Sequence, residues 1–167
     1  NNQAATQCWR LAMENVETPT ALIFSRQAIK DLPESVDYIG VEKGAYEIVK
    51  EEHPDVILLA SGSEVSTLVD TLPLLQEKKI KARVISCPSE GLFRRQSAEY
   101  QEKLLPADAK VFALTAGLPA TFEGLVGSNG YIYGLDHFGY SAPYQVLDDK
   151  LGFTPQQVAD KIIDFVK

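Results

Sequence analysis

Hydrophobic positions near the N-terminus recur every three or four residues, a spacing that predicts an amphipathic helix. The members of this apolar stripe are Ala5, Cys8, Trp9, Ala12, Met13 and Val16. Thr18-Pro19 ends the pattern, and the apolar run from Thr20 to Phe24 predicts a buried strand. One helix and one strand cannot bury their own apolar faces, so we expect both to belong to a neighbouring domain, most of which lies outside this sequence.

Beyond residue 44, short apolar runs alternate with helical patterns. The five predicted strands are Ala45 to Val49, Val56 to Ala60, Ala82 to Ser86, Lys110 to Leu114 and Tyr131 to Leu135. The second run is apolar throughout, as in a strand covered on both faces. This order predicts a three-layer α/β fold with a mostly parallel, mixed five-stranded sheet and helices on both faces. The first strand is expected at an edge and is the candidate for an antiparallel neighbour.

Capping residues mark where the intervening helices begin. Ser61 and Glu64 have the spacing of a capping box, Ser63 is a second N-cap candidate, and Pro73 predicts a kink or an early end. Ser89 is expected to cap a second helical region that extends through Tyr100. The last helix begins at Thr154-Pro155-Gln156-Gln157, and its predicted buried face is Val158, Ile162 and Phe165 or Val166.

An acidic stretch that contains proline, Lys30 to Val41, has the composition of a linker between domains. We therefore expect residues 1–35 to be the end of one domain, residues 36–43 a linker, and residues 44–167 a second domain. The sequence opens within a helical pattern and without an initiator methionine, so we expect a piece of a larger protein.

Composition excludes several classes of function. The 167 residues are 45% hydrophobic and 23% charged, which is typical of a globular domain. A net charge of -7 argues against nucleic acid or anionic lipid as a partner, and no apolar stretch reaches the length of a membrane span. Cys8 and Cys87 form no metal or redox motif, so we expect two small buried hydrophobic side chains and a reducing cytoplasm.

Two segments carry candidate binding chemistry. Ser25-Arg26-Gln27 follows the first predicted strand, and an arginine at a strand's carboxyl end offers a planar fork of donors to a phosphate. The alternative is an exposed arginine paired with a carboxylate. Ser61-Gly62-Ser63 lies between a strand and a helix N-terminus, where backbone N–H groups can hold an anion. It lacks a Walker lysine, and simple helix capping is the alternative.

The remaining polar residues give no catalytic or metal site. His137 has no serine elbow to work with and is expected in a turn or an interface. The pairs Glu51-Glu52 and Asp148-Asp149 are expected on the solvated surface. Four tyrosines near the last strand are candidates for a pocket, for core packing or for a subunit contact: Tyr131, Tyr133, Tyr140 and Tyr144.

The order of motifs resembles the C-terminal portion of a transketolase along the whole chain. The resemblance is carried by Ser25-Arg26-Gln27, Gly44-Ala45-Tyr46, the run from Asp55 to Val65, Arg83 to Ser89, and Asp136-His137-Phe138-Gly139-Tyr140-Ser141-Ala142-Pro143. Thr115-Ala116-Gly117 departs from it, because family members often have a glutamate before the alanine and glycine.

The resemblance implies a function in the pentose phosphate pathway. A transketolase is a cytoplasmic homodimer that transfers a two-carbon ketol unit from a ketose phosphate to an aldose phosphate, using thiamine diphosphate and Mg²⁺. The family's metal-binding Gly-Asp-Gly and its activating glutamate belong to other domains, and neither is found here. The resemblance therefore implies that this chain alone binds no cofactor, is inactive, and supports the dimer. Its implied partners are the other domains and sugar phosphates, with Arg26 gripping the substrate phosphate.

Two alternatives remain open. The chain could be a non-catalytic α/β module that binds a partner or a regulatory anion at Ser61-Gly62-Ser63. It could also be the C-terminal part of a related thiamine diphosphate enzyme, such as a dihydroxyacetone synthase or a 1-deoxyxylulose phosphate synthase. The sequence upstream of this chain would discriminate them.

Overall fold

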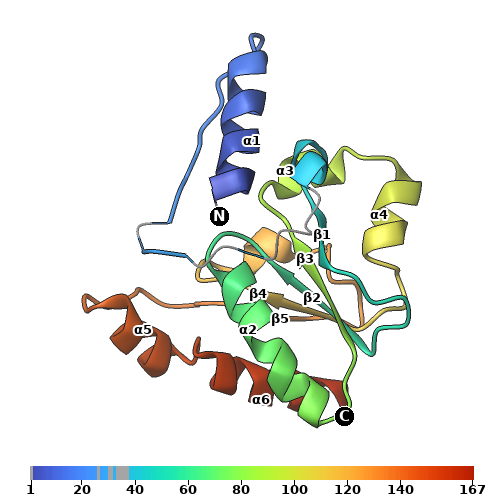
Figure 1. Cartoon of the computed structure of the whole chain (residues 1–167), viewed down its shortest axis with the longest axis vertical. Helices are drawn as coiled ribbons and strands as arrows, with labels where there is room; N and C mark the ends of the chain where they lie inside the picture. The colour runs from blue at the N-terminus through green and yellow to red at the C-terminus, as the bar shows by residue number, and fades with distance from the viewer. Residues whose placement is uncertain (1, 26, 30–31, 33–37) are drawn as a thin grey trace.

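A computed structural model describes residues 2–25, 27–29, 32 and 38–167 (Figure 1). A helix, α1 (Asn2–Glu14), precedes a short 3-10 helix, η1 (Tyr38–Lys43), which leads into an α/β sheet domain. The strands are β1 (Tyr46–Val49), β2 (Val56–Ala60), β3 (Ala82–Ser86), β4 (Val111–Leu114) and β5 (Tyr131–Tyr133). All five predicted strands after residue 44 are therefore confirmed, with ends that differ by at most a few residues.

The strands form one sheet in the order β1-β3-β2-β4-β5. β3, β2, β4 and β5 run parallel, whereas β1 lies at the edge and pairs with β3 in the antiparallel sense. The register shifts between Glu47 and Val49, which marks a bulge in the edge strand. The predicted mixed sheet and its antiparallel edge strand are confirmed.

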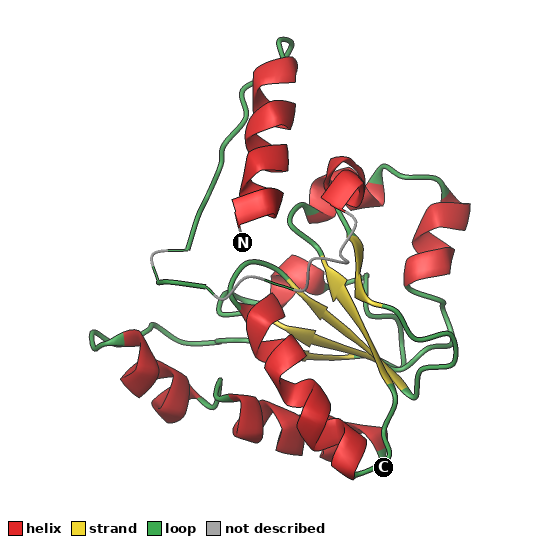
Figure 2. Ribbon diagram, viewed as in Figure 1, coloured by secondary structure: helices red, strands yellow, loops and turns green. Residues whose placement is uncertain are grey.

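Alternate side chains of β2 point to opposite faces of the sheet and enter two separate cores. Val56, Leu58 and Ala60 face the core that is covered by α2 (Glu64–Glu77) and α6 (Pro155–Val166). Ile57 and Leu59 face the other core, which is covered by α3 (Glu90–Arg94), α4 (Ala98–Leu104) and η2 (Pro119–Phe122). Figure 2 shows the strands between these two sets of helices, as the predicted three-layer architecture requires.

Some helical predictions need correction. Pro73 was predicted to cause a kink or an early end, and the early end is wrong because α2 continues past Pro73 to Glu77. The N-cap residue of α2 is Ser63, the second candidate, although its side chain makes no capping bond. Since Ser61 is not the N-cap, the predicted capping box of Ser61 and Glu64 is wrong. The region after Ser89 is two helices, because Ser97 accepts a bond from the Tyr100 amide and begins a new one.

The last helix follows its prediction. Thr154 accepts a hydrogen bond from the Gln157 amide, and Val158 and Ile162 are fully buried against α2. An additional helix, α5 (Tyr144–Leu151), was not predicted, and it ends at Gly152 in the left-handed conformation.

The N-terminal arm, defined here as residues 2–25, differs from the sheet domain. Ala4, Cys8 and Leu11 of α1 pack against the core of the sheet domain, so the predicted helix is confirmed. The predicted strand from Thr20 to Phe24 is wrong for this chain, since these residues form an irregular segment beside α1, with Phe24 stacked on Trp9. A strand needs a neighbouring strand for its backbone hydrogen bonds, and the sheet that the structure describes lies elsewhere.

The predicted linker is described only in its last residues. Tyr38 and Val41 of η1 are buried in the core beneath β1. The earlier residues 30–31 and 33–37 lie outside the described residues, and the division at 35 and 43 stays a prediction. Cys87 is buried, which raises the pKa of its thiol to about 12, whereas Cys8 is only half-buried.

Candidate functional site

The carboxyl edge of the parallel strands brings the candidate residues together. Because β2, β4 and β5 are parallel, the segments that follow them emerge at the same edge. These segments begin at Ser61, Thr115 and Gly134. Binding chemistry in an open α/β sheet is expected at such an edge, which lies at the ends of the β2, β4 and β5 arrows (Figure 1).

The turn between β2 and α2 contacts the N-terminal arm at Ser25. Gly62 has a φ of +63°, which favours glycine, and a Cβ at this position would lie 3.6 Å from the Ser25 Oγ. Ser25, Gly62 and Ser86 line a hollow of about 200 Å³ between the arm and the sheet domain. The two parts of the chain that sequence analysis singled out are therefore neighbours.

Arg26, the predicted phosphate-binding residue, lies outside the described residues. Its neighbours in sequence are described, and they bracket the N-terminus of α2. Ser25 faces Gly62 on one side, while Gln27 lines a second hollow of about 170 Å³ with Ser63 and Glu64.

The N-terminus of α2 already has a negative charge of its own. Ser63 donates its hydroxyl hydrogen bond to Oε1 of Glu64 over 3.0 Å. Burial raises the pKa of the Glu64 carboxyl, and the nearby Asp148 raises it further, while this hydrogen bond opposes the shift. Since a carboxylate in the first turn satisfies the helix dipole, the geometry does not favour a second anion there. The anion site at Ser61-Gly62-Ser63 stays a prediction.

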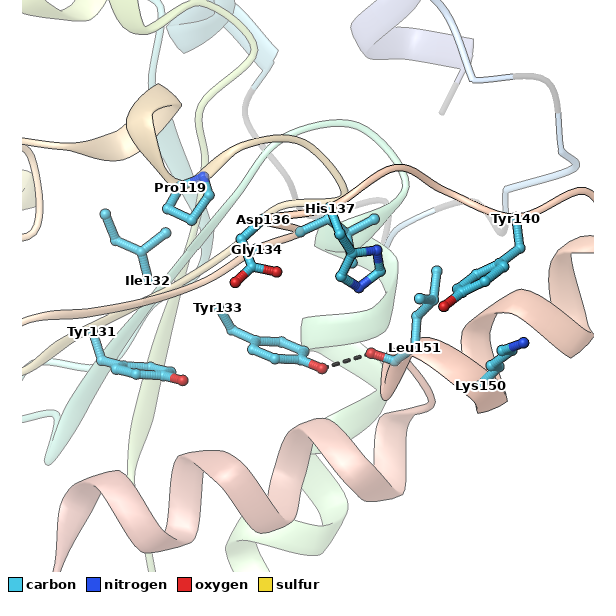
Figure 3. Close-up of a pocket in the computed structure, with 11 residues that line it drawn as sticks. Pro119, Tyr131, Ile132, Tyr133, Gly134, Asp136, His137, Tyr140, Lys150 and Leu151 are labelled. Carbon is cyan, nitrogen blue, oxygen red and sulfur yellow. Dashed lines mark hydrogen bonds between the residues drawn. The ribbon is translucent and has the colours of Figure 1, made fainter.

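A third hollow, of about 500 Å³, lies beyond β5 (Figure 3). Tyr133 crosses its floor and donates a hydrogen bond to the carbonyl oxygen of Leu151 over 2.6 Å. The Lys150 ammonium lies 3.9 Å from the centre of the Tyr140 ring. His137 is exposed, and its Nδ1 lies 2.8 Å from the Phe138 carbonyl oxygen, as expected for a turn residue. Among the residues that line this hollow, no hydrogen bond joins a nucleophile to a base.

Of the four tyrosines, three line this hollow: Tyr131, Tyr133 and Tyr140. Tyr144 instead lines the hollow beside Glu64. Tyr133 also packs on Phe153, with ring centres 5.3 Å apart, so its ring serves the core as well as the hollow.

Among the described residues, no group of three or more His, Cys, Asp or Glu side chains could hold a metal ion. None of the helices in the described part of the chain has the length and the apolar character needed to cross a bilayer.

Comparison with known proteins decides what kind of domain this is. Residues 44–154 match the family model of the transketolase-like TK C-terminal domain. The chain belongs to this family. The matched transketolase domain begins at Gly44, immediately after η1, and includes β1 to β5 and the newly found α5.

Individual transketolases agree with the family match. The chain is 42% identical over 154 residues to a transketolase of Halalkalibacterium halodurans, covering 90% of this chain and 23% of that protein. It is 39% identical over 160 residues to a transketolase of Aquifex aeolicus, covering 93% of this chain and 23% of that protein. The chain therefore spans about a quarter of the length of the curated relatives that it matches.

Solved transketolases have the same fold. A Leishmania mexicana transketolase superposes with a TM-score of 0.90 at 31% identity, covering 99% of this chain and 24% of that one. A Pichia stipitis transketolase, solved in complex with sedoheptulose 7-phosphate, has a TM-score of 0.86 at 31% identity and covers 98% and 24%. The resemblance stated from the motifs is thus confirmed, including for the residues before Gly44.

Sequence analysis did not single out Glu64 as part of the candidate site. Glu64 lines, together with Ser63 and Gln27, the hollow beside the N-terminus of α2. Its signal was present in the sequence, since a carboxylate directly after Ser61-Gly62-Ser63 weakens the case for an anion at that turn.

Proposed function

We propose that this chain is the C-terminal part of a transketolase that transfers a two-carbon ketol unit between ketose and aldose phosphates in the pentose phosphate pathway. The observation that supports this most directly is the family match over residues 44–154, together with homologues that are transketolases over nearly the whole chain. The Pichia stipitis relative binds sedoheptulose 7-phosphate, which supports sugar phosphates as the substrates.

Thiamine diphosphate and Mg²⁺ belong to the complete enzyme in this proposal. Two observations support placing the cofactor in the other domains: the sequence contains no Gly-Asp-Gly, and the described residues contain no cluster of metal ligands. The other domains of the enzyme, in a cytoplasmic homodimer, would hold the cofactor and supply its chemistry. Alone, this chain is then inactive and serves as a structural and dimer-supporting part.

Arg26 is the chain's proposed contribution to substrate binding. A guanidinium offers paired N–H donors that match two phosphate oxygens. Ser25 and Gln27, on either side of it, lie beside the carboxyl edge of the sheet. In the proposed division of the chain, residues 1–35 complete the cofactor-binding middle domain, 36–43 link it, and 44–167 form the C-terminal domain. Arg26 would thus lie near the boundary between the two domains.

The test is the substitution Arg26→Ala in the complete enzyme, with Arg26→Lys as the matched control that keeps the charge. A charge-assisted hydrogen bond contributes roughly 1.5–3 kcal/mol, so kcat/KM for phosphorylated substrates should fall by roughly 10- to 150-fold. An unphosphorylated donor such as hydroxypyruvate should be affected much less. Equal losses with both kinds of substrate would mean that Arg26 has a structural role only.

A further inference from the structure

We propose that the hollow beyond β5 binds a nucleotide whose base has an amino group next to a ring nitrogen, as adenine has. The volume of this hollow, about 500 Å³, lies in the range of roughly 300–1,000 Å³ that is typical of small-molecule sites. The site is independent of the proposed function, because its groups are separate from Arg26. It offers free backbone groups to the base, an aromatic ring for stacking, and one charged side chain of each sign to the ribose and the phosphate.

The outer edge of β5 supplies the backbone groups. β5 is an edge strand and pairs only with β4 in the described sheet. The Tyr133 carbonyl oxygen and the Leu135 amide both form hydrogen bonds on the β4 side, of 3.0 and 2.9 Å. Because peptide groups alternate along a strand, the N–H and C=O groups of Ile132 and Gly134 point away from β4. No hydrogen bond within the described part of the chain satisfies them, so they are open to a ligand in the hollow.

The order of these backbone groups suits the edge of an adenine base. The Ile132 carbonyl oxygen is an acceptor, and the Gly134 N–H, two residues later on the same edge, is a donor. Adenine presents the complementary pair, an amino donor beside a ring-nitrogen acceptor. Hypoxanthine has a carbonyl oxygen in place of the amino group, so it would oppose the Ile132 carbonyl oxygen with a second acceptor. The edge therefore favours an aminated base over its deaminated counterpart.

An aromatic ring borders the space next to this edge. The Tyr133 ring is held in one orientation, because its hydroxyl donates a hydrogen bond to the Leu151 carbonyl oxygen over 2.6 Å. In Figure 3, Asp136 and His137 lie above this ring, and all three side chains line the hollow. Stacking on aromatic side chains is a common way for a protein to hold a base. A base that bonds to the β5 edge can thus lie between Tyr133 and His137.

The two fully charged side chains of the hollow, Asp136 and Lys150, form no ion pair within the described part of the chain. The Lys150 ammonium lies 3.9 Å from the centre of the Tyr140 ring, a cation–π contact that keeps it at the hollow. A lysine ammonium binds phosphate as a point charge, and an aspartate after a strand can accept hydrogen bonds from ribose hydroxyls. One cation and one carboxylate beside an aromatic ring therefore match the three parts of a nucleotide.

The test is isothermal titration with adenosine monophosphate of the 167-residue chain, and of the complete enzyme that contains it, with the cofactor site filled. Saturable binding with a Kd below about 1 mM is expected. Inosine monophosphate should bind at least about 10-fold more weakly, because its base lacks the amino donor for Ile132. Adenosine, which keeps the base and lacks the phosphate, should also bind about 10-fold more weakly than its monophosphate.

Lys150→Gln separates the phosphate contact from the base contact. It should weaken adenosine monophosphate by about 10-fold and leave adenosine unchanged. Lys103→Gln is the matched control, since Lys103 is also exposed in the last turn of a helix but does not line the hollow. The site is overturned by the absence of saturable binding, by equal affinities for the two monophosphates, or by equal losses of adenosine and its monophosphate in Lys150→Gln. Binding by the chain that disappears in the complete enzyme would also overturn it, because another domain then covers the hollow.

Discussion

The sheet domain and the N-terminal arm both contain runs of apolar residues. These side chains are buried in the sheet domain, whereas several of those in the arm are exposed to solvent. In the sheet domain, no residue of β2 is more than 1% exposed. In the arm, Met13 is 76%, Val16 85% and Ile23 94% exposed. The difference shows that an apolar run predicts a buried element only when a partner surface is available to it. For β2 that partner is the rest of the sheet and two helical layers. The irregular segment after α1 instead lies beside α1 and borders the sheet domain across a hollow.

The comparison is tested most strongly by removing one apolar side chain from each region. Leu58→Ala creates a cavity between β2 and the surrounding helices, and it should lower the free energy of unfolding by about 2–5 kcal/mol. Ile23→Ala removes a side chain that is already in solvent and should change it by less than about 0.5 kcal/mol. Urea unfolding of both variants of this chain measures the difference. A comparable loss at Ile23 would show that the arm is buried in solution.

A smaller effect is expected from removing the arm as a whole. A chain that begins at Tyr38 keeps both buried residues of η1 and should unfold in one cooperative transition. It loses the contacts of Ala4, Cys8 and Leu11, which contribute about 1–2 kcal/mol, so its Tm should fall by about 2–8 °C.

A chain that begins at Gly44 is the matched control for this truncation. It also loses Tyr38 and Val41, which are 7% and 3% exposed, and should therefore be clearly less stable than the chain that begins at Tyr38. If the longer of the two chains already lacks a cooperative transition, then the arm and the sheet share one core, and the proposed division of the chain is wrong.

The sheet could be predicted because each of its strands is a short apolar run in the sequence, and such runs fit a sheet that is covered by helices. β2 is apolar throughout, and Ser89 and Thr154 begin helices by accepting hydrogen bonds from nearby amides. The antiparallel edge strand and the order of the strands depend on pairing across the sheet. The spacing of apolar residues along the chain only reduces the number of possible strand arrangements. α5 escaped prediction because it is a short helix of eight residues and its apolar pattern is correspondingly brief; none of its residues is buried.

The candidate site was only partly predictable for a related reason. Arg26 and Ser61-Gly62-Ser63 were selected because each follows an apolar run, which is a local signal. The proximity of Ser25 to Gly62 connects residues far apart in sequence, and it depends on how the arm packs on the sheet domain.

The smallest expected effect concerns the ion pair between Arg10 of the arm and Glu42 of η1. Arg10 Nη2 lies 3.7 Å from Oε2 of Glu42, and both side chains are 44% exposed. Arg10 also forms a 2.8 Å pair with Glu14 in its own helix. Because exposed pairs are screened by water and salt, Glu42→Gln should change the free energy of unfolding by less than about 0.5 kcal/mol.

Glu14→Gln is the matched control, since it removes only the pair within α1 and leaves the contact between the arm and η1 intact. Any difference between the two variants should disappear in 0.5–1 M salt, on the order of the concentration at which the screening length falls below the ion-pair distance. If Glu42→Gln instead costs more than removing the whole arm, the arm is held by charge rather than by Ala4, Cys8 and Leu11. The contrast between the two regions would then be electrostatic in origin, and apolar burial would not explain it.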